Sequence, residues 1–195
     1  MSQLINRRNA IKTGLLASGG LAVLSQLGKA ANPLTTTQEE TNKAIVGHWF
    51  TDFWGKTCNL GIVDELAVPD MLLQYSLHKP RRGRSEIKTF MSGFRQAFPD
   101  LNFWGVADLI AEGDYVVGRW EGGGTHTGPA FSDFVIGSLP AATDRKMHFT
   151  GTTVLKLKNG KIVEEVGLDD GVTALQQLGL IVRTDLPRQS SRYPL

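Results

Sequence analysis

Alternation between apolar and polar side chains is clearest between Met147 and Lys158. An extended backbone places five side chains, four of them apolar, on one face of a strand: Met147, Phe149, Thr153, Leu155 and Leu157. Asn159-Gly160 comes next, and this pair tolerates positive φ at both central positions of a two-residue turn. We therefore predict a β-hairpin that folds back through residues 161–163 and buries one face.

Spacings of three and four residues replace this alternation in the first half of the chain. Large apolar side chains recur in this way over residues 44–54 and again over residues 87–98. Such spacing is typical of amphipathic helices that bury one side. A shorter helix over 62–66 and an apolar strand over 71–75 are predicted between them.

The second half of the chain reads as extended segments. These run over residues 101–110 and, after a turn at 112–114, over residues 115–121. A glycine run at 122–124 and a Gly- and Pro-interrupted loop at 129–144 then lead to the hairpin. An apolar helical stretch over 172–180 follows the hairpin. Helices first, then an antiparallel meander, then a short helix predict an α+β fold in which helices cover the concave face of a curved sheet. Such an arrangement leaves a pocket between the two layers.

The length of the chain and the composition of its N-terminal segment predict one folded domain that follows an export signal and a linker. The 195 residues suit one folded domain, which we place at 41–181 after a polar linker at 32–40 and before a loose tail at 182–195. Residues 1–31 are interpreted as an export signal, because Arg7-Arg8 precede an apolar run in the manner of twin-arginine signals. This predicts a periplasmic or secreted protein with no stable membrane anchor after processing. An ordinary secretory signal and a cytosolic amphipathic helix are the alternatives.

Charge and metal-binding residue types exclude two classes of function. Residues 1–31 hold four of the 21 lysines and arginines and none of the 19 acids, so the remainder carries a net charge of −2. A nucleic-acid partner therefore loses its main support. The four histidines are widely spaced and the chain has one cysteine, so no metal site is predicted.

An ordered set of segments resembles the SnoaL-like polyketide cyclase family, within the superfamily that shares the nuclear-transport-factor-2 cone fold. The resemblance covers about residues 43–181. Its matching segments are Arg82-Gly83-Arg84, Phe94 to Leu101, Asp108 to Asp114, Gly124 to Gly128, Gly160 to Glu164 and Leu175 to Leu180. It implies a cone-shaped sheet of mixed or antiparallel strands, no metal or organic cofactor, a homodimer, and acid/base chemistry on a small apolar carbonyl compound.

Two adjacent carboxylates end the hairpin and supply the predicted catalytic group. Asp170 aligns with the acid/base aspartate of the family, and His126 is the expected assistant because histidine titrates near neutral pH. Asp169 points the opposite way in an extended backbone, so one of the pair is expected to face the pocket. The alternatives are that Asp170 caps the following helix and that His126 bonds a nearby carbonyl in its loop.

Aromatic and histidine side chains supply the predicted substrate-binding wall. Sequence does not separate a wall residue from a core residue among them. The predicted set is His78, Tyr75, Trp49, Phe53, Trp104 and Trp120, together with Asp169.

The chain departs from its relatives beside this wall. Glu165-Val166 stands where the family often has His-Trp, and Gly167 follows. A wall of different polarity leaves three functions open: an exported acid/base enzyme, a non-catalytic protein that binds a small molecule, and a domain that binds a partner through its outer sheet face.

Overall fold

The computed structural model describes residues 36–182 and residue 184, so the expected export signal lies outside the described residues. Five helical elements are present in this range: α1 (Gln38–Trp49), the π-helix η1 (Phe50–Trp54), α2 (Ile62–Leu66), α3 (Arg84–Ala97) and α4 (Gly171–Gln177). The strands are β1 (Ala67–Tyr75), β2 (Arg81–Arg82), β3 (Asn102–Gly105), β4 (Ile110–Glu112), β5 (Tyr115–Thr125), β6 (Lys146–Lys158) and β7 (Lys161–Asp169).

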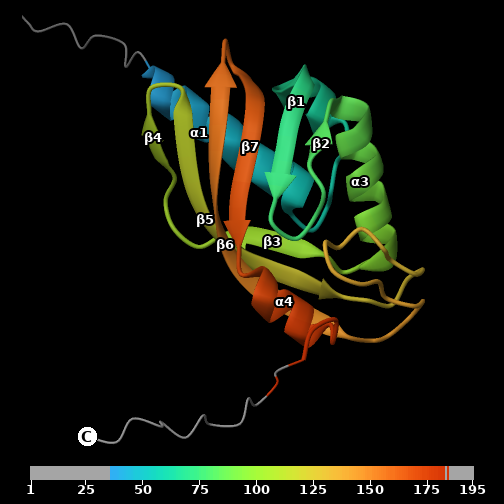
Figure 1. Cartoon of the computed structure of the whole chain (residues 1–195). Helices are drawn as coiled ribbons and strands as arrows, with labels where there is room; N and C mark the ends of the chain where they lie inside the picture. The colour runs from blue at the N-terminus through green and yellow to red at the C-terminus, as the bar shows by residue number, and fades with distance from the viewer. Residues whose placement is uncertain (1–35, 183, 185–195) are drawn as a thin grey trace, which may run out of the picture. The chain divides into compact units, whose positions relative to one another are not determined.

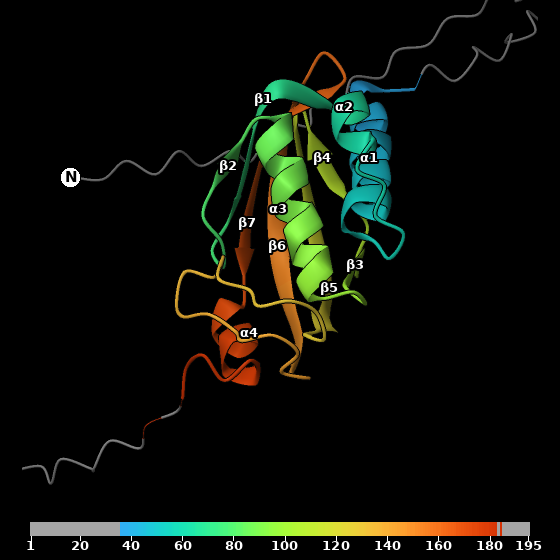
Figure 2. The ribbon, with the colours of Figure 1, turned by 90° about the vertical axis from the view of Figure 1, so that its right-hand side faces the viewer.

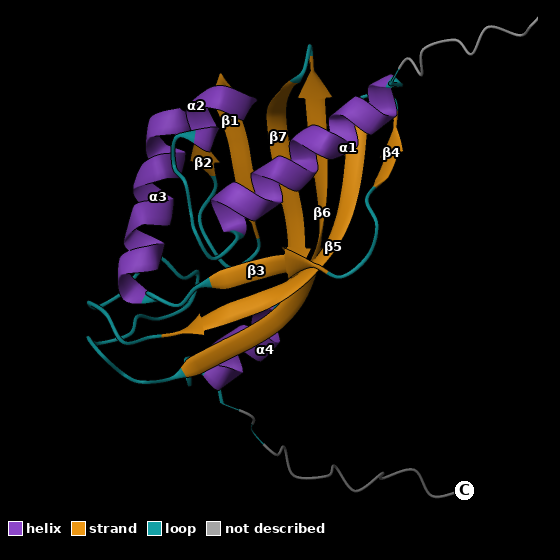
Figure 3. Cartoon of the chain, turned by 180° about the vertical axis from the view of Figure 1, so that it is seen from behind, coloured by secondary structure: helices purple, strands orange, loops and turns teal. Residues whose placement is uncertain are grey.

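The seven strands form one strongly curved, unclosed sheet in the order β2-β1-β7-β6-β5-β3, with β4 also paired to β5 (Figure 1). Strands β1 and β7 are parallel and all other neighbours are antiparallel. Helices α1, α2 and α3 lie across the same face of this sheet (Figures 2 and 3). The predicted α+β fold, with a mixed sheet covered by helices, is confirmed.

The first helix begins earlier and ends differently than the spacing predicts. Thr37 caps it by accepting a hydrogen bond from the backbone N–H of Glu40, so residues 38–40 belong to the helix instead of the expected linker. At Phe50 the helix widens into a π-helical turn, which Gly55 closes by donating its N–H to the Phe50 carbonyl. As a result, Trp54 is buried together with Trp49 and Phe53.

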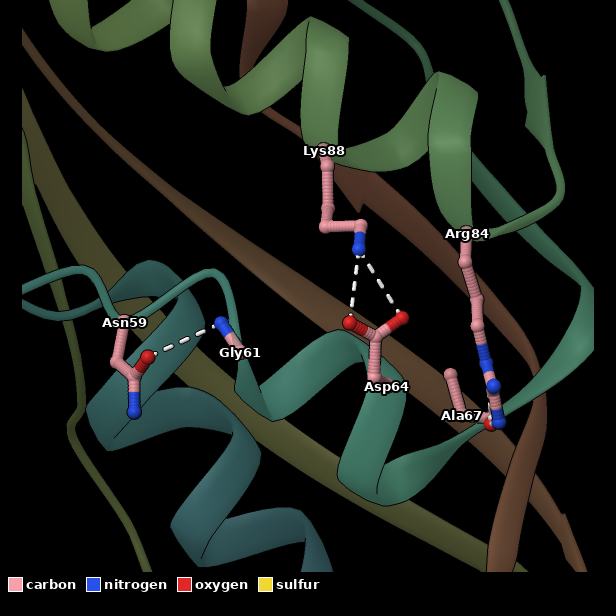
Figure 4. A network of polar contacts seen from close by, with 6 residues as sticks. All are labelled: Asn59, Gly61, Asp64, Ala67, Arg84 and Lys88. Carbon is pink, nitrogen blue, oxygen red and sulfur yellow. Dashed lines mark hydrogen bonds and ion pairs between the residues drawn. The ribbon is translucent and has the colours of Figure 1, made fainter.

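Helix α3 is held against α2 and the start of β1 by polar contacts (Figure 4). The ammonium group of Lys88 lies 3.0 and 2.8 Å from the two carboxylate oxygens of Asp64. The guanidinium group of Arg84 donates to the backbone carbonyl of Ala67, with its Nε at 3.0 Å. These contacts fix the N-terminal end of α3.

The predicted hairpin of β6 and β7 is confirmed. Asn159 and Gly160 have φ values of 51° and 72°, as a two-residue hairpin turn requires. Buried and exposed side chains alternate along β6 from Met147 onward. The glycine run, expected to follow a strand, instead lies within β5, which continues to Thr125.

Helix α4 covers β6 where β7 no longer pairs with it. Gln177 accepts the backbone N–H of His148 at 2.7 Å and donates to its carbonyl at 3.1 Å. The described helices include none that is long and apolar enough to cross a membrane.

Candidate functional site

A narrow pocket lies between η1, α3 and the concave face of the sheet. About 20 Å³ of it is open to the centre of a water molecule, so a larger ligand requires lining side chains to move apart. Most of its wall is aromatic. The lining residues are Phe50, Trp54, Tyr75, Leu77, His78, Phe94, Phe103, Trp120, Phe149 and Asp169.

Asp169, the last residue of β7, is the carboxyl group in this wall. The hydroxyl group of the exposed Ser76 donates a hydrogen bond to Asp169 Oδ1. Burial raises the pKa of Asp169 above its usual value, although the Ser76 hydrogen bond and the charge of His78 act in the opposite direction. A carboxyl group of this kind can exchange a proton with a bound molecule at moderate pH.

Glu165, also on β7, lies behind the wall and is completely buried. Its Oε2 accepts the indole N–H of Trp49 at 2.7 Å, while its Oε1 accepts the indole N–H of Trp54 at 2.9 Å and the hydroxyl of Tyr75 at 2.5 Å. Burial raises the pKa of Glu165 to about 7, although these three hydrogen bonds lower it. Among the described residues, no lysine, arginine or histidine forms an ion pair with it.

The hydroxyl of Tyr75 links Glu165 to the opposite side of the pocket. It lies 2.9 Å from Thr153 Oγ1, which in turn accepts the indole N–H of Trp120 at 2.7 Å. Because Tyr75 donates to Glu165, Thr153 must donate to Tyr75, and the three hydrogen bonds run in one direction toward the carboxylate. Burial and the charge of Glu165 raise the pKa of Tyr75 well above its usual value, which keeps the phenol protonated.

Two glycines make room for these rings on the sheet. A Cβ on Gly167 would lie 2.1 Å from the Tyr75 ring, and a Cβ on Gly151 would lie 2.1 Å from the Trp120 ring. Each glycine sits in register beside the strand residue whose ring crosses it. Larger side chains at either position would displace the ring that forms the wall.

His78 lies in the wall among phenylalanines and is 8% exposed. Its ring stacks on Phe134 with the centroids 5.3 Å apart, and its Nδ1 lies 3.4 Å from the Asp133 carbonyl and 3.6 Å from the Asp133 carboxylate. Arg81 pairs with the same carboxylate. Burial raises the pKa of Asp133, but the hydrogen bonds from His78 and Arg81 outweigh it and lower that pKa. Asp133 thus orients His78 at the pocket.

Asp170 lies outside the pocket wall, contrary to the predicted placement. It is exposed, and its carboxylate caps α4 by accepting the backbone N–H of Thr173 at 3.2 Å. The alternation of side chains along the end of β7 places Asp169 in the pocket instead.

His126 also lies away from the wall. Its ring is completely buried against Phe98, with Nδ1 2.9 Å from the Thr143 hydroxyl and Nε2 2.9 Å from the Pro129 carbonyl. Both ring nitrogens are therefore occupied in holding the loop over 129–144, which is the alternative that sequence left open.

The other predicted wall residues divide into three groups. Tyr75, His78, Trp120 and Asp169 line the pocket. Trp49 and Phe53 are completely buried behind it, where they stack with ring centroids 4.4 Å apart. Trp104 is 43% exposed and stacks on His148, so it faces away from the pocket.

Sequence reasoning missed six apolar wall residues and the role of Glu165. A usable signal was present for Glu165, since it stands where the family often has a different residue. The missed wall residues are Phe50, Trp54, Leu77, Phe94, Phe103 and Phe149. In the described part of the chain, no group of three His, Cys, Asp or Glu residues is arranged to hold a metal ion.

A family model described as SnoaL-like polyketide cyclase matches residues 44–178. The chain belongs to this family. No curated protein matches it. The resemblance that sequence suggested is confirmed, and the SnoaL-like domain spans the curved sheet, its helices and the pocket.

Solved structures share this fold at low sequence identity. A candidate SnoaL-like polyketide cyclase from a Jannaschia species is 19% identical, with a TM-score of 0.60 over 72% of this chain and 92% of that one. AclR, a candidate hydroxylase from Streptomyces galilaeus, is 21% identical, with a TM-score of 0.57 over 77% and 91%. A protein of ketosteroid isomerase-like fold from Catenulispora acidiphila, in complex with trimethylamine, is 17% identical, with a TM-score of 0.55 over 70% and 93%. At these sequence identities, the similarity shows a shared fold and nothing further.

Proposed function

We propose that this SnoaL-like protein is an enzyme that performs acid/base chemistry on a small carbonyl compound, with Asp169 as the catalytic acid/base. The observation that carries the proposal is the Asp169 carboxyl group in a largely aromatic wall, beside His78. Proton removal next to a carbonyl needs a base in a dry cavity whose pKa is raised toward the working pH. Burial acts on Asp169 in that sense.

His78 is the proposed partner of Asp169, in place of His126. Its ring lines the same pocket and is held by Asp133, so an imidazole N–H there can donate to the carbonyl oxygen. In the proposed step, Asp169 takes the proton from the carbon next to the carbonyl, and the electron pair moves to the carbonyl oxygen. Return of the proton to another position, or attack of the resulting carbanion on a second carbonyl, completes an isomerisation or an aldol closure.

Substitution of Asp169 tests this role, and the adjacent Asp170 supplies a matched control. Asp169→Asn should lower turnover of a panel of small ketones, aldehydes and esters by at least about a hundredfold. Asp170→Asn should leave turnover unchanged, because asparagine also caps helices well. Equal turnover by the wild type and Asp169→Asn, with both proteins folded by circular dichroism, would reject Asp169 as the acid/base.

A non-catalytic pocket protein is the second candidate. It is favoured by the small number of polar groups in the wall, which suits retention of an apolar molecule. Native mass spectrometry of the purified protein distinguishes the two functions. A ligand that stays bound and is never converted supports the binding protein, whereas an empty pocket with turnover that depends on Asp169 supports the enzyme.

Export and self-association stay proposals beside this function. Arg7 and Arg8 before an apolar run support export by the twin-arginine route. Fractionation of cells that produce the full chain and the variant with both arginines replaced by lysine tests the route, and equal export would oppose it. Light scattering after size-exclusion chromatography tests the homodimer.

A further inference from the structure

Four aromatic rings close a circuit at the inner end of the pocket. Ring centroids are 5.2 Å apart between Trp54 and Tyr75, 6.0 Å between Tyr75 and Trp120, 5.4 Å between Trp120 and Phe103, and 5.7 Å between Phe103 and Trp54. Each contact in the circuit is edge-to-face, with interplanar angles from 65° to 88°. These are contact separations between rings, so a cation comes within roughly 6 Å of their faces only when the rings move apart to admit it.

A carboxyl group stands immediately behind this circuit. Trp54 and Tyr75 each contribute a ring to the circuit and a hydrogen bond to Glu165. Three neutral donors solvate the Glu165 carboxylate, but in the described residues no cation pairs with it. Among the residues that line the pocket, His78 is the one with a basic side chain. Above about pH 7, where Glu165 is ionised, the inner end therefore combines aromatic rings with a negative charge that no cation neutralises.

The charge of the ligand decides how such a site interacts with it. An apolar neutral group gains only from burial against the rings, and an anion is repelled by Glu165 and Asp169. A methylated ammonium group gains from burial, from the ring faces and from the carboxylate, and it has few N–H groups that need partners. A primary ammonium group has three donors to satisfy and finds few acceptors in an aromatic wall.

We propose that the inner end of the pocket binds a methylated ammonium group, so that the ligand is a small organic cation whose uncharged end reaches Asp169. The inference rests on the proposed function for the role of Asp169 and adds the charge class of the substrate. The open space accommodates little more than one water molecule, so the head group must be small and the rings must part to admit it.

Binding of choline tests the proposal against its uncharged isostere, in which a carbon atom replaces the nitrogen. The two molecules have the same shape, so a difference in affinity measures the charge. Isothermal titration calorimetry of the wild type at pH 8 should show choline binding at least about tenfold more tightly than the isostere. Equal affinities, tighter binding of the isostere, or no binding of choline at millimolar concentration would overturn the proposal.

Two pairs of variants locate the effect. Phe103→Leu removes one ring face from the circuit and keeps an apolar side chain, so it should weaken choline binding by about fivefold while changing isostere binding little. Trp104→Leu, the exposed neighbour on β3, should change neither. Glu165→Gln should reduce the preference for choline, and Glu164→Gln, the same change one residue earlier on β7, should retain it.

The outcome is separable from that of the proposed function. If turnover of neutral carbonyl compounds depends on Asp169 while choline and its isostere bind equally, the catalytic role stands and the cation site fails. If choline is preferred and Asp169→Asn changes no turnover, the cation site stands and the catalytic role fails.

Discussion

The rim and the inner end of the pocket each receive a carboxyl group from β7, and the two groups have opposite surroundings. Asp169 marks the rim, because it is half-buried and accepts a hydrogen bond from Ser76, an exposed residue directly after β1. Glu165 at the inner end is completely buried and accepts three hydrogen bonds from aromatic side chains of η1, α1 and β1. The same strand thus presents one carboxyl group to a place that a ligand can enter and another to a rigid, dry network.

This difference in surroundings indicates that the carboxyl groups of Asp169 and Glu165 have different roles. A group that transfers a proton must reach a molecule that enters and leaves, as Asp169 can. A group whose acceptor sites are occupied by fixed donors is suited to hold a charge or to orient its donors, and Tyr75 and Trp54 are oriented in this way.

Removal of Glu165 should therefore have the largest effect on stability. Glu165→Ala leaves two indole N–H groups and one hydroxyl without their acceptor in the core, which should lower the free energy of unfolding by about 3 to 5 kcal/mol. Asp169→Ala should lower it by less than about 1 kcal/mol, because Ser76 can turn to water. Urea unfolding of both variants measures the difference.

Glu165→Gln refines this comparison. The amide oxygen can still accept from Trp54 and Tyr75, which share Oε1, and only Trp49 then faces an amide nitrogen. Its destabilisation should therefore lie between those of the two alanine variants. A loss of stability in Glu165→Ala no larger than in Asp169→Ala would show that the inner network contributes little.

The pH dependence of stability should also distinguish the two ends. The pKa of Glu165 rises from 4.5 to about 7 on folding, so the folded chain holds a proton that the unfolded chain releases between these pH values. The contribution of Glu165 to the free energy of unfolding is therefore largest below pH 4.5. It falls as the pH rises through 7, by about 3 kcal/mol in all.

Denaturant unfolding across this range measures the effect as a difference between variants. Glu165→Gln should remove most of the decline. Asp169→Asn should remove a smaller part, because its raised pKa acts in the same direction at a half-buried site. The same decline in the wild type and Glu165→Gln would contradict the assignment of the raised pKa to Glu165.

The hairpin and the layer order could be predicted from sequence because they depend on local patterns. The alternation along β6 and the Asn159-Gly160 turn are local, and the structure has both. The direction of Glu165 could not be predicted in this way. Alternation counted from the buried Ile162 puts Glu164 on the inner face, but the register shifts between β6 and β7 near this point, and Glu165 faces inward instead.

The site was harder to predict because its members meet only in the folded chain. Trp54 faces the pocket because the first helix widens to a π-helix at Phe50, and spacing alone does not predict that widening. The choice between Asp169 and Asp170 depends on where β7 ends and α4 begins. Sequence narrowed the candidate catalytic group to Asp169 and Asp170, and the position of the strand end decides which of the two lines the pocket.

Asp170 gives the smallest expected effect. Asp170→Ala removes the acceptor for the Thr173 N–H at the start of α4, and loss of such a cap lowers the free energy of unfolding by about 1 kcal/mol. Asp170→Asn should restore nearly all of it. Because α4 packs on β6 beyond the end of β7 and supplies no residue to the pocket wall, turnover at saturating substrate should be unchanged in both variants. A large loss of turnover in Asp170→Ala, at a temperature where the variant is fully folded, would assign the acid/base role to Asp170 instead of Asp169. Asp169 and Glu165 would then differ in their position and not in their role.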